Sequence, residues 1–308
     1  MQTRTLKSDS LLLVAAFFWG TTFVAQRAAM DHLGPMTFNG SRFILGAVTL
    51  LPLIALRKKG AGTVKESRVR FVLGGGALAG LALFGGASFQ QMGLVYTTAG
   101  KAGFITSLYM VLVPLMGLFL GHRHGSSLWV GVVLAVAGLY LLSVTESLSI
   151  GRGDLLVLIS ALFWAIHVLL IGYLAKRASA LRIACVQLVV CSALSFVVAC
   201  LTESIAVAGI GAAAIPILYA GVLSAGVAFT LQIFCQRTSP PAHAGIIMGL
   251  ETVFAALAGW VVLGERLGLR GLAGCALMLA GVLVVQLPPL LGSRANSPRL
   301  AGDGVGCS

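Results

Sequence analysis

The stretch DSLLLVAAFFWG, residues 9–20, returns as DLLVLISALFWA at residues 154–165. Each copy begins with Asp, continues through apolar residues and ends in Phe-Trp and a small residue, at an offset of 145 residues. A pattern shared by two distant parts of one chain indicates an internal repeat.

Further matches keep the same order along both halves of the chain, at offsets of 142 or 143 residues. They are Gln90 with Gln232, Ala102-Gly103 with Ala244-Gly245, Gly131 with Gly274 and Gly138 with Gly281. We therefore place one copy at residues 1–147 and a second at 148–290. Residues 291–308, rich in Gly and Ser, are expected to form a disordered C-terminal tail.

The composition places both copies in a membrane. Of the 308 residues, 58% are hydrophobic and 10% are charged, whereas soluble domains have about 25% charged residues. This excludes a soluble enzyme and a disordered protein. At about 30 residues for each span and its loop, the length predicts roughly ten membrane-spanning helices.

Ten apolar stretches are long enough to cross a bilayer as helices, and none shows the alternation of a membrane β-barrel. They are Leu11–Ala29, Met36–Leu56, Phe71–Tyr96, Ala99–Leu120, Ser127–Val144, Asp154–Ala175, Leu181–Leu201, Ala212–Phe234, Ala242–Leu263 and Leu269–Leu287. Five spans per copy is an odd number, so the second copy crosses the membrane in the opposite sense. The predicted fold is an all-α integral membrane protein, with ten transmembrane helices as two inverted five-helix repeats around a central cavity.

The basic residues predict the orientation. The formal net charge is +12. Fifteen of the 21 Lys and Arg fall at the termini and in the loops after spans 2, 4, 6 and 8, and five fall on the other side. This bias favours cytoplasmic termini in a plasma (inner) membrane, and it explains the net charge without a nucleic-acid partner. The loop 57–70 is the most basic and is expected to lie against anionic lipid headgroups.

Five short motifs follow one another along this framework. They are Phe18-Trp19-Gly20, Arg42-Phe43, Leu112-Val113-Pro114, LETVFAAL at residues 250–257 and LGERL at residues 263–267. In this order on a five-plus-five repeat, they resemble the EamA-type drug/metabolite transporter superfamily. The resemblance implies metabolite movement, often export, through a central cavity, with cytoplasmic termini. Two positions depart from the family pattern. Thr252 stands where the family often has Pro. At the end of span 4, His122 replaces the Glu of the family's Gly-Glu-Arg motif, so that this chain has Gly121-His122-Arg123.

No sequence motif indicates catalysis. The P-loop, the His-Glu-x-x-His pattern and the Gly-x-Ser-x-Gly pattern are absent, so neither an enzyme nor ATP-driven transport is predicted. Five of the six cysteines lie in or beside apolar segments, and none forms a Cys-x-x-Cys pair. They are interpreted as small core residues, and no cofactor or metal is expected.

Two charged residues are predicted to lie well inside the bilayer. Glu251 falls about 14 Å into span 9, near the midplane. A carboxylate there is costly unless it is paired or protonated, so it is expected to take up a proton, meet a substrate ammonium or form a structural pair. Arg42 lies about 9 Å from the nearer end of span 2. It is expected to bind a substrate carboxylate, to extend toward the headgroups or to pair with Glu251 as a gate.

Aromatic and histidine side chains are further candidates for the cavity. Trp19 and Trp164 lie about ten residues into their spans, too deep for an interfacial belt, and either line a cavity or pack in the core. His167 follows Trp164 by one turn and either shuttles protons or forms a hydrogen bond between helices.

Polar residues that the repeat relates to each other complete the predicted site. Gln90 and Gln232 are aligned amides inside the membrane, where lipid cannot satisfy their hydrogen bonds. Gln187 aligns with Arg42, and Tyr109 aligns with Glu251. We predict that these aligned positions form a ring around one cavity. Two more aligned residues, Lys101 and His243, begin spans 4 and 9 and either reach a cavity mouth or meet headgroups.

Small residues and one proline indicate how the spans pack. Gly76 and Gly80 are spaced to give span 3 a flat face for a neighbouring helix. Pro114 is expected to bend span 4 and free a backbone carbonyl.

These features favour a secondary transporter that exports a small organic metabolite by alternating access. Arg42 and Glu251 together suit an amino acid or a related zwitterion. Efflux of hydrophobic or cationic drugs is the first alternative, and a non-transporting membrane scaffold or an intramembrane enzyme is the second. The bilayer and a small-molecule substrate are the expected partners, with a proton or another coupling ion as a further candidate; the oligomeric state stays open.

Overall fold

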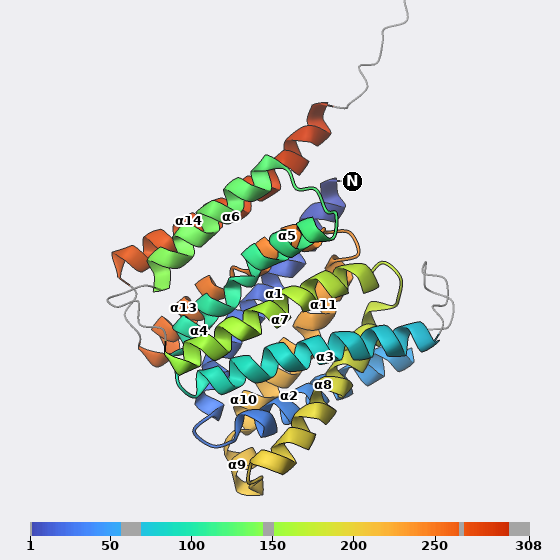
Figure 1. Cartoon of the computed structure of the whole chain (residues 1–308), viewed down its shortest axis with the longest axis vertical. Coiled ribbons are helices and arrows are strands. Elements are labelled where there is room, and N and C mark those ends of the chain that lie inside the picture. Colours follow the sequence, from blue (N-terminus) through green and yellow to red (C-terminus); the bar gives the residue numbers. More distant parts are fainter. Residues whose placement is uncertain (1, 57–68, 144–150, 265–267, 296–308) are drawn as a thin grey trace, which may run out of the picture.

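The computed structural model describes residues 2–56, 69–143, 151–264 and 268–295. Within these ranges all regular secondary structure is helical, short turns join the helices, and there is no strand. Figure 1 shows the long helices running side by side, with α6 and α14 forming a pair along one edge of the bundle.

The described residues form fifteen helical segments; fourteen of them make up the ten predicted spans, several of which consist of more than one segment, and α9 lies between spans 7 and 8. The segments are α1 (Gln2–Ala29), α2 (Pro35–Leu56), α3 (Val69–Leu94), α4 (Ala99–Ser107), α5 (Tyr109–Phe119), α6 (Ser126–Ser143), α7 (Arg152–Leu174), α8 (Ala180–Thr202), α9 (Val207–Ala212), α10 (Ala214–Leu218), η1 (Tyr219–Ala228), α11 (Phe229–Cys235), α12 (Pro241–Met248), α13 (Glu251–Leu263) and α14 (Leu269–Ala295).

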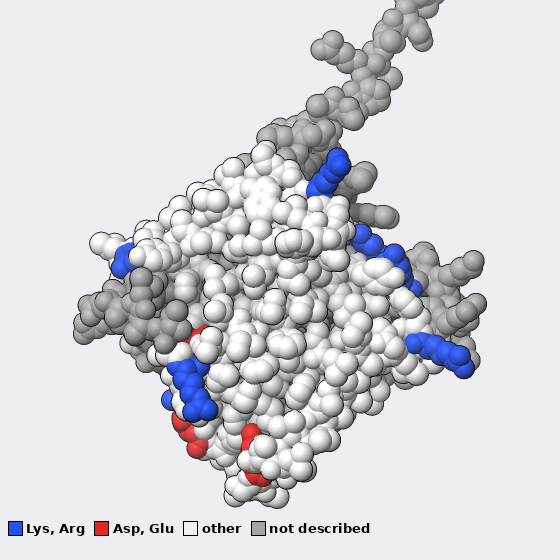
Figure 2. Space-filling model, viewed as in Figure 1, with Lys and Arg blue, Asp and Glu red and all other residues white. Residues whose placement is uncertain are grey.

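The membrane-spanning character of the chain is confirmed. Eight helical stretches among the described residues are long and apolar enough to cross a bilayer, and Ser126–Leu141 and Leu269–Val285 are shorter apolar helices at the places of spans 5 and 10. Inside a bilayer the backbone must satisfy its own hydrogen bonds, which an α-helix does within one segment. The distribution of charge at the surface agrees with a membrane-spanning bundle. Figure 2 shows charged residues at two opposite edges, with an uncharged band between them.

The contacts between helices follow the inverted repeat. Helix α3 packs on α7 and α8, and its counterpart η1 packs on α1 and α2. Helix α1 packs on α13, as its counterpart α7 packs on α4 and α5. The remaining large contacts join a helix to its own counterpart, α2 with α8 and α6 with α14. This pattern is what a pseudo-two-fold axis between inverted repeats produces.

Two spans are interrupted at aligned positions. In span 4 the α-helix stops at Leu108, whose amide donates to the Ile105 carbonyl at 3.2 Å. In span 9 it stops at Gly249 and Leu250, where the Leu250 amide donates to the Ile247 carbonyl at 3.2 Å. Leu108 and Leu250 are related by the repeat offset of 142. Both spans are therefore pairs of half-helices.

Pro114, which is predicted to bend span 4, does not coincide with the interruption of that span. Pro114 lies inside α5, and the interruption is six residues earlier, at Leu108. A proline deprives the carbonyl four residues before it of a partner, so its effect falls within the first turn of α5. The repeat-related break in span 9 has no proline, which shows that the break belongs to the fold.

Span 8 departs from α-helical geometry over its central ten residues, Tyr219–Ala228, which form a π-helical segment. The aligned residues of span 3 lie within the regular helix α3. Segments of this kind are frequent at functional sites because they change which side chains share a face. Here the segment packs against α2, the helix that contains Arg42.

The predicted flat face of span 3 is confirmed. A methyl group built at Gly80 would lie 2.7 Å from the Val190 Cβ and 3.0 Å from the Gln187 carbonyl oxygen, and one at Gly76 would lie 2.7 Å from the Val186 Cβ. Both glycines therefore allow α3 and α8 to approach closely.

Replacing Gly80 by Ala is expected to lower the free energy of unfolding by about 1–3 kcal/mol, because α3 and α8 must separate. Gly74→Ala is the matched control, since Gly74 lies on the same helix and has nothing within 4 Å of the added methyl. Alanine favours a helix, so the control is expected to lose no stability. Thermal unfolding in one detergent compares the two, and equal stability would contradict the close-packing account.

The described residues include part of the predicted C-terminal tail and five of the six cysteines. Helix α14 continues through residues 291–295, and the rest of the predicted tail, 296–308, lies outside the described residues. The five described cysteines are free: Cys191, Cys235 and Cys275 are buried, Cys185 is half-buried and Cys200 is exposed.

Candidate functional site

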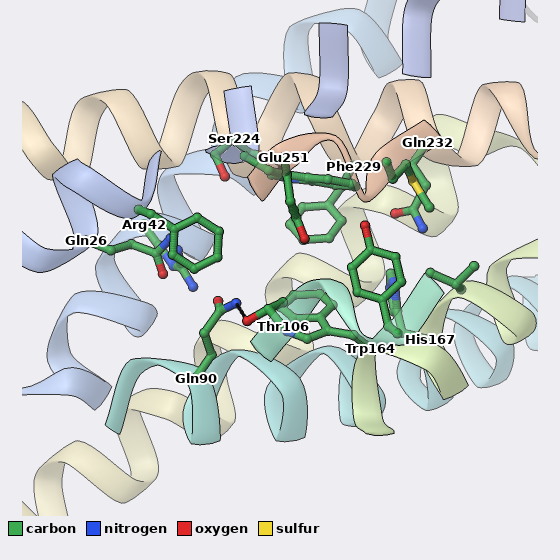
Figure 3. A pocket seen from close by; sticks show the side chains of 15 residues that line it. Gln26, Arg42, Gln90, Thr106, Trp164, His167, Ser224, Phe229, Gln232 and Glu251 are labelled. Carbon is green, nitrogen blue, oxygen red and sulfur yellow. Dashed lines mark hydrogen bonds between the residues drawn. The ribbon is translucent and has the colours of Figure 1, made fainter. Parts of the chain in front are cut away.

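A cavity of about 500 Å³ lies between the two repeats. It is lined by Trp19, Phe23, Gln26, Arg42, Gln90, Thr106, Tyr109, Trp164, His167, Val168, Ser224, Phe229, Gln232, Met248 and Glu251. Eight of the nine predicted site residues are among them. In Figure 3, Arg42 and Glu251 enter this space from separate helices, and Gln90 and Trp164 face it from the opposite side.

The pseudo-two-fold axis organises the lining. Five repeat-related pairs account for ten of the fifteen residues: Trp19 with Trp164, Phe23 with Val168, Gln90 with Gln232, Thr106 with Met248 and Tyr109 with Glu251. The other five residues have counterparts that do not line the cavity. Chemical differences between the two halves of the cavity therefore come from these five and from the unlike pairs.

Glu251 is held at the start of a half-helix. It is the first residue of α13, directly after the interruption of span 9, and its side chain is 4% exposed. A helix N-terminus carries partial positive charge, which favours a carboxylate there. The Tyr109 hydroxyl, from the first residue of α5, approaches the same carboxylate. Both broken spans thus direct the first side chain of their second half-helix into the cavity.

Arg42 reaches the cavity from α2 and is 4% exposed. Its guanidinium carbon lies 4.6 Å from the centre of the Phe43 ring and 5.3 Å from that of Phe38. Among the described residues, no carboxylate oxygen lies within 4.0 Å of the guanidinium, and its Nε has no hydrogen-bond partner. In this structure the Arg42 side chain therefore lies in the cavity and makes no direct ion pair with Glu251.

Aromatic rings form one wall of the cavity. Trp164 stacks on Phe229 with an interplanar angle of 15° and ring centres 6.0 Å apart, and Trp19 packs on the same ring at 5.1 Å. The Trp19 indole N–H donates to the Ser224 carbonyl oxygen at 3.3 Å. This wall offers flat apolar surface to a planar or cationic group.

His167 and Gln187 are joined to each other. The His167 Nε2–H donates to Gln187 Oε1 at 2.9 Å, which leaves Nδ1 of the ring without a partner. This is the expected hydrogen bond between helices, α7 to α8. Gln187 is 0% exposed and does not line the cavity, which corrects the predicted ring. A glutamine side chain is shorter than that of Arg42, its aligned residue, and the imidazole lies in front of it.

Gln90 and Gln232 both line the cavity, as predicted, but their hydrogen bonds differ. The Gln90 side-chain amide donates to Thr106 Oγ1 at 2.9 Å. The carbonyl oxygen of the Gln232 side chain has no partner, and the same holds for Gln26 Oε1 and the Trp164 indole N–H. Buried polar atoms are nearly always hydrogen-bonded. These atoms are therefore available to a polar substrate in the cavity.

Comparison with known proteins identifies the chain's relatives. The model of the EamA-like transporter family matches residues 6–144 and again residues 151–287. The chain belongs to the EamA-like transporter family. Each match corresponds to one of the two repeats deduced from the sequence.

Relatives and a solved structure agree with this membership. An "Uncharacterized transporter" of Archaeoglobus fulgidus is 32% identical over 92% of this chain and 87% of its own length. The "Uncharacterized transporter YoaV" of Bacillus subtilis is 23% identical over 89% of this chain and 94% of its own length. A solved crystal structure matches with a TM-score of 0.76 at 20% identity, covering 92% of this chain and 98% of that one, which shows a shared fold.

One departure from the EamA pattern has a structural explanation. Thr252, in the place where that family often has Pro, donates from its hydroxyl to the Gly103 carbonyl oxygen at 3.1 Å and is also hydrogen-bonded to the Ser107 hydroxyl. A proline cannot make these bonds. In this EamA protein, side-chain hydrogen bonds tie the two broken spans together beside Glu251.

The sequence analysis missed seven lining residues. Phe23 and Val168 follow the two cavity tryptophans by four residues, which places them on the same helical face, so helical spacing was a usable signal. Alignment at the offset of 142 relates Thr106 to Met248. Gln26 follows Phe23 by three residues and Phe229 precedes Gln232 by three, so helical spacing was a usable signal for both. Ser224 has no aligned partner in the cavity and lies in the π-helical segment.

Proposed function

We propose that this EamA-like protein is a secondary transporter that exports a small organic metabolite by alternating access, and that its substrate is an amino acid or a related zwitterion. The observation that supports this best is the pair of opposite charges on separate walls of the cavity. Arg42 offers a guanidinium without a carboxylate partner, and Glu251 offers a carboxylate. A zwitterion neutralises both at once.

Each charge suits one group of such a substrate. A guanidinium binds a carboxylate through two parallel hydrogen bonds, which fixes its direction as well as its position. A buried carboxylate binds an ammonium or takes up a proton. The unpartnered Gln232 and Gln26 oxygens accept further hydrogen bonds from the substrate. Glu251 thus also supplies a site for a proton as the coupling ion.

The proposed placement puts the protein in the plasma (inner) membrane with both termini in the cytoplasm. The excess of Lys and Arg in the loops on that side supports this orientation. The substrate and the coupling ion then cross between two aqueous compartments through the cavity at the centre of the bundle.

The aromatic wall supports a second candidate function, efflux of hydrophobic cations. Trp19, Trp164 and Phe229 present ring faces beside Glu251, and cations bind such faces. This alternative gives Arg42 no task, since a guanidinium repels a cationic drug. The zwitterion therefore accounts for more of the cavity.

The test is transport by the purified protein in proteoliposomes, with a panel of radiolabelled amino acids and amines, with and without a pH gradient. We expect saturable transport of at least one zwitterion, and a dependence on the gradient if a proton is coupled. Cells that express the protein are expected to resist toxic amino-acid analogues and not cationic dyes. Resistance to dyes alone would favour the second candidate, and transport of neither class would refute both.

A further inference from the structure

An ion pair with a buried carboxylate and a partly exposed ammonium joins the first turns of α4 and α7. The Lys101 ammonium is 2.6 Å from Asp154 Oδ2, with the Asp154 side chain 6% exposed and that of Lys101 39%. The Asp154 carboxylate also accepts from the Thr97 hydroxyl at 3.0 Å and from the Gly151 amide at 2.8 Å. These bonds hold the start of α4 against the start of α7.

A second pair joins α1 to α12. His243 Nε2 lies 3.1 Å from Asp9 Oδ1, and the two side chains are 10% and 7% exposed. Next to them, the hydroxyls of Ser8 and Thr238 are hydrogen-bonded at 3.0 Å. These bonds hold the start of α12 against the first part of α1.

The two pairs are counterparts in the inverted repeat. Asp9 aligns with Asp154 at the offset of 145, and Lys101 aligns with His243 at the offset of 142. Each Asp lies ten residues before a cavity tryptophan on its own helix, or about 15 Å along it. Helices α1 and α7 begin at opposite ends of the bundle (Figure 1). One pair therefore lies beyond each end of the cavity.

Each pair also controls a half-helix. Lys101 belongs to α4, which ends at the interruption at Leu108, and His243 belongs to α12, which ends at the interruption at Gly249 and Leu250. At both interruptions the backbone bonds span three residues instead of four, Leu108 to Ile105 and Leu250 to Ile247, and such a local change in helix geometry is a place where a span can hinge. Separating either pair frees one half-helix to turn away from the neighbouring repeat.

We propose that Lys101–Asp154 and Asp9–His243 are two gating latches that close opposite ends of the cavity, and that they open in alternation. This inference rests on the proposed alternating-access function. It assigns the closing contacts to residues outside the cavity lining. A substitution in either latch therefore changes the side of the membrane from which the cavity is accessible, while the residues that line the cavity stay intact.

The test measures access to the cavity without any substrate. In a chain whose natural cysteines are replaced by alanine, Val168→Cys provides one thiol in the cavity lining. A membrane-impermeant maleimide is applied to each face of oriented vesicles. Asp154→Asn is expected to raise the labelling rate from the face at its own end about five-fold and to lower it from the other face. Asp9→Asn is expected to do the reverse.

Two controls separate the latch from a loss of structure. Asp31→Asn removes an exposed acid in the turn after α1 that pairs with Arg27 near the end of that helix, and is expected to leave both labelling rates unchanged. The exchanged pair, Lys101→Asp with Asp154→Lys, is expected to restore part of the change in labelling, because the ion pair returns while the bonds from Thr97 and Gly151 to the carboxylate are lost. Unfolding temperatures in detergent confirm that each variant is folded.

The outcomes of the labelling experiment decide the proposal independently of transport. Opposite shifts in the two Asn variants support the latches, even if no substrate is found. The latches would be overturned if both Asn variants changed the labelling rate from the same face in the same direction, or if folded variants kept the parent rates. Either result would count even if the protein transports a zwitterion. If the cysteine-free chain does not fold, oxidation of a Lys101→Cys/Asp154→Cys pair replaces the labelling: loss of transport that a reductant reverses supports a latch, and unchanged transport overturns it.

Discussion

Arg42→Gln is expected to weaken the binding of a carboxylate-bearing substrate by roughly 100-fold, equivalent to about 3 kcal/mol. The guanidinium lies at the cavity surface with two phenyl rings behind it and no carboxylate of the described chain beside it. We propose a substrate carboxylate as its counter-charge, and glutamine retains polarity without supplying the positive charge that such a group needs. The concentration dependence of transport measures the effect, and quenching of Trp19 and Trp164 fluorescence measures binding directly.

Two further variants define what the guanidinium contributes. Arg42→Lys keeps the charge and loses the two-point geometry, so we expect an intermediate loss of about ten-fold. Arg27→Gln is the surface control, since the Arg27 side chain is 40% exposed and pairs with Asp31 in the turn just after its helix. Binding at the parent affinity in a folded Arg42→Gln protein would show that this residue does not meet the substrate.

Glu251→Gln is expected to reduce transport of a zwitterion by about 100-fold, because the amide has the shape of the carboxylate but cannot neutralise an ammonium. The same variant is expected to transport an amine-free carboxylate analogue at least as well as the parent, since the buried negative charge no longer repels it. Comparison of the two substrates in proteoliposomes separates loss of an ammonium site from general damage.

A proton-carrying function of Glu251 has a different signature. In that case Glu251→Gln still exchanges substrate across a membrane without a gradient, but a pH gradient no longer drives accumulation. Asp31→Asn is the matched control, an acid that is 66% exposed and remote from the cavity lining. Parent behaviour in both the exchange and the gradient assays would contradict either function for Glu251.

The repeated pattern in the sequence was sufficient to predict the arrangement of the helices. Aligned Asp, Trp and Gln residues related the halves, and the odd number of spans required their inversion. The interruptions at Leu108 and Leu250 were not predicted, because leucine favours a helix and the signal that drew attention, Pro114, lies in the next turn. The interruptions lie where the two spans contact each other, with Ser107 and Thr252 hydrogen-bonded between them, and local propensity does not describe such a contact.

The site was predicted best where the repeat duplicates a residue type. Trp19 with Trp164 and Gln90 with Gln232 line the cavity on both sides of the axis. The prediction that Gln187 lines the cavity was wrong, because alignment transfers a backbone position and not the length of a side chain. Ser224 lies in a π-helical segment, where the 3.6-residue period no longer tells which side chains share a face, so no spacing argument reaches it.

The two aligned breaks have one further consequence, which concerns why the halves share a single polypeptide. An antiparallel dimer of identical subunits would place the same residue twice about its axis. Two glutamates facing each other there would repel, and one would be forced to hold a proton. A covalently fused pair escapes this constraint, and the position that is Glu251 in one half is Tyr109 in the other. Fusion of the two halves thus permits a single carboxylate near the symmetry axis. A cavity made asymmetric in this way suits an asymmetric substrate that binds in one orientation.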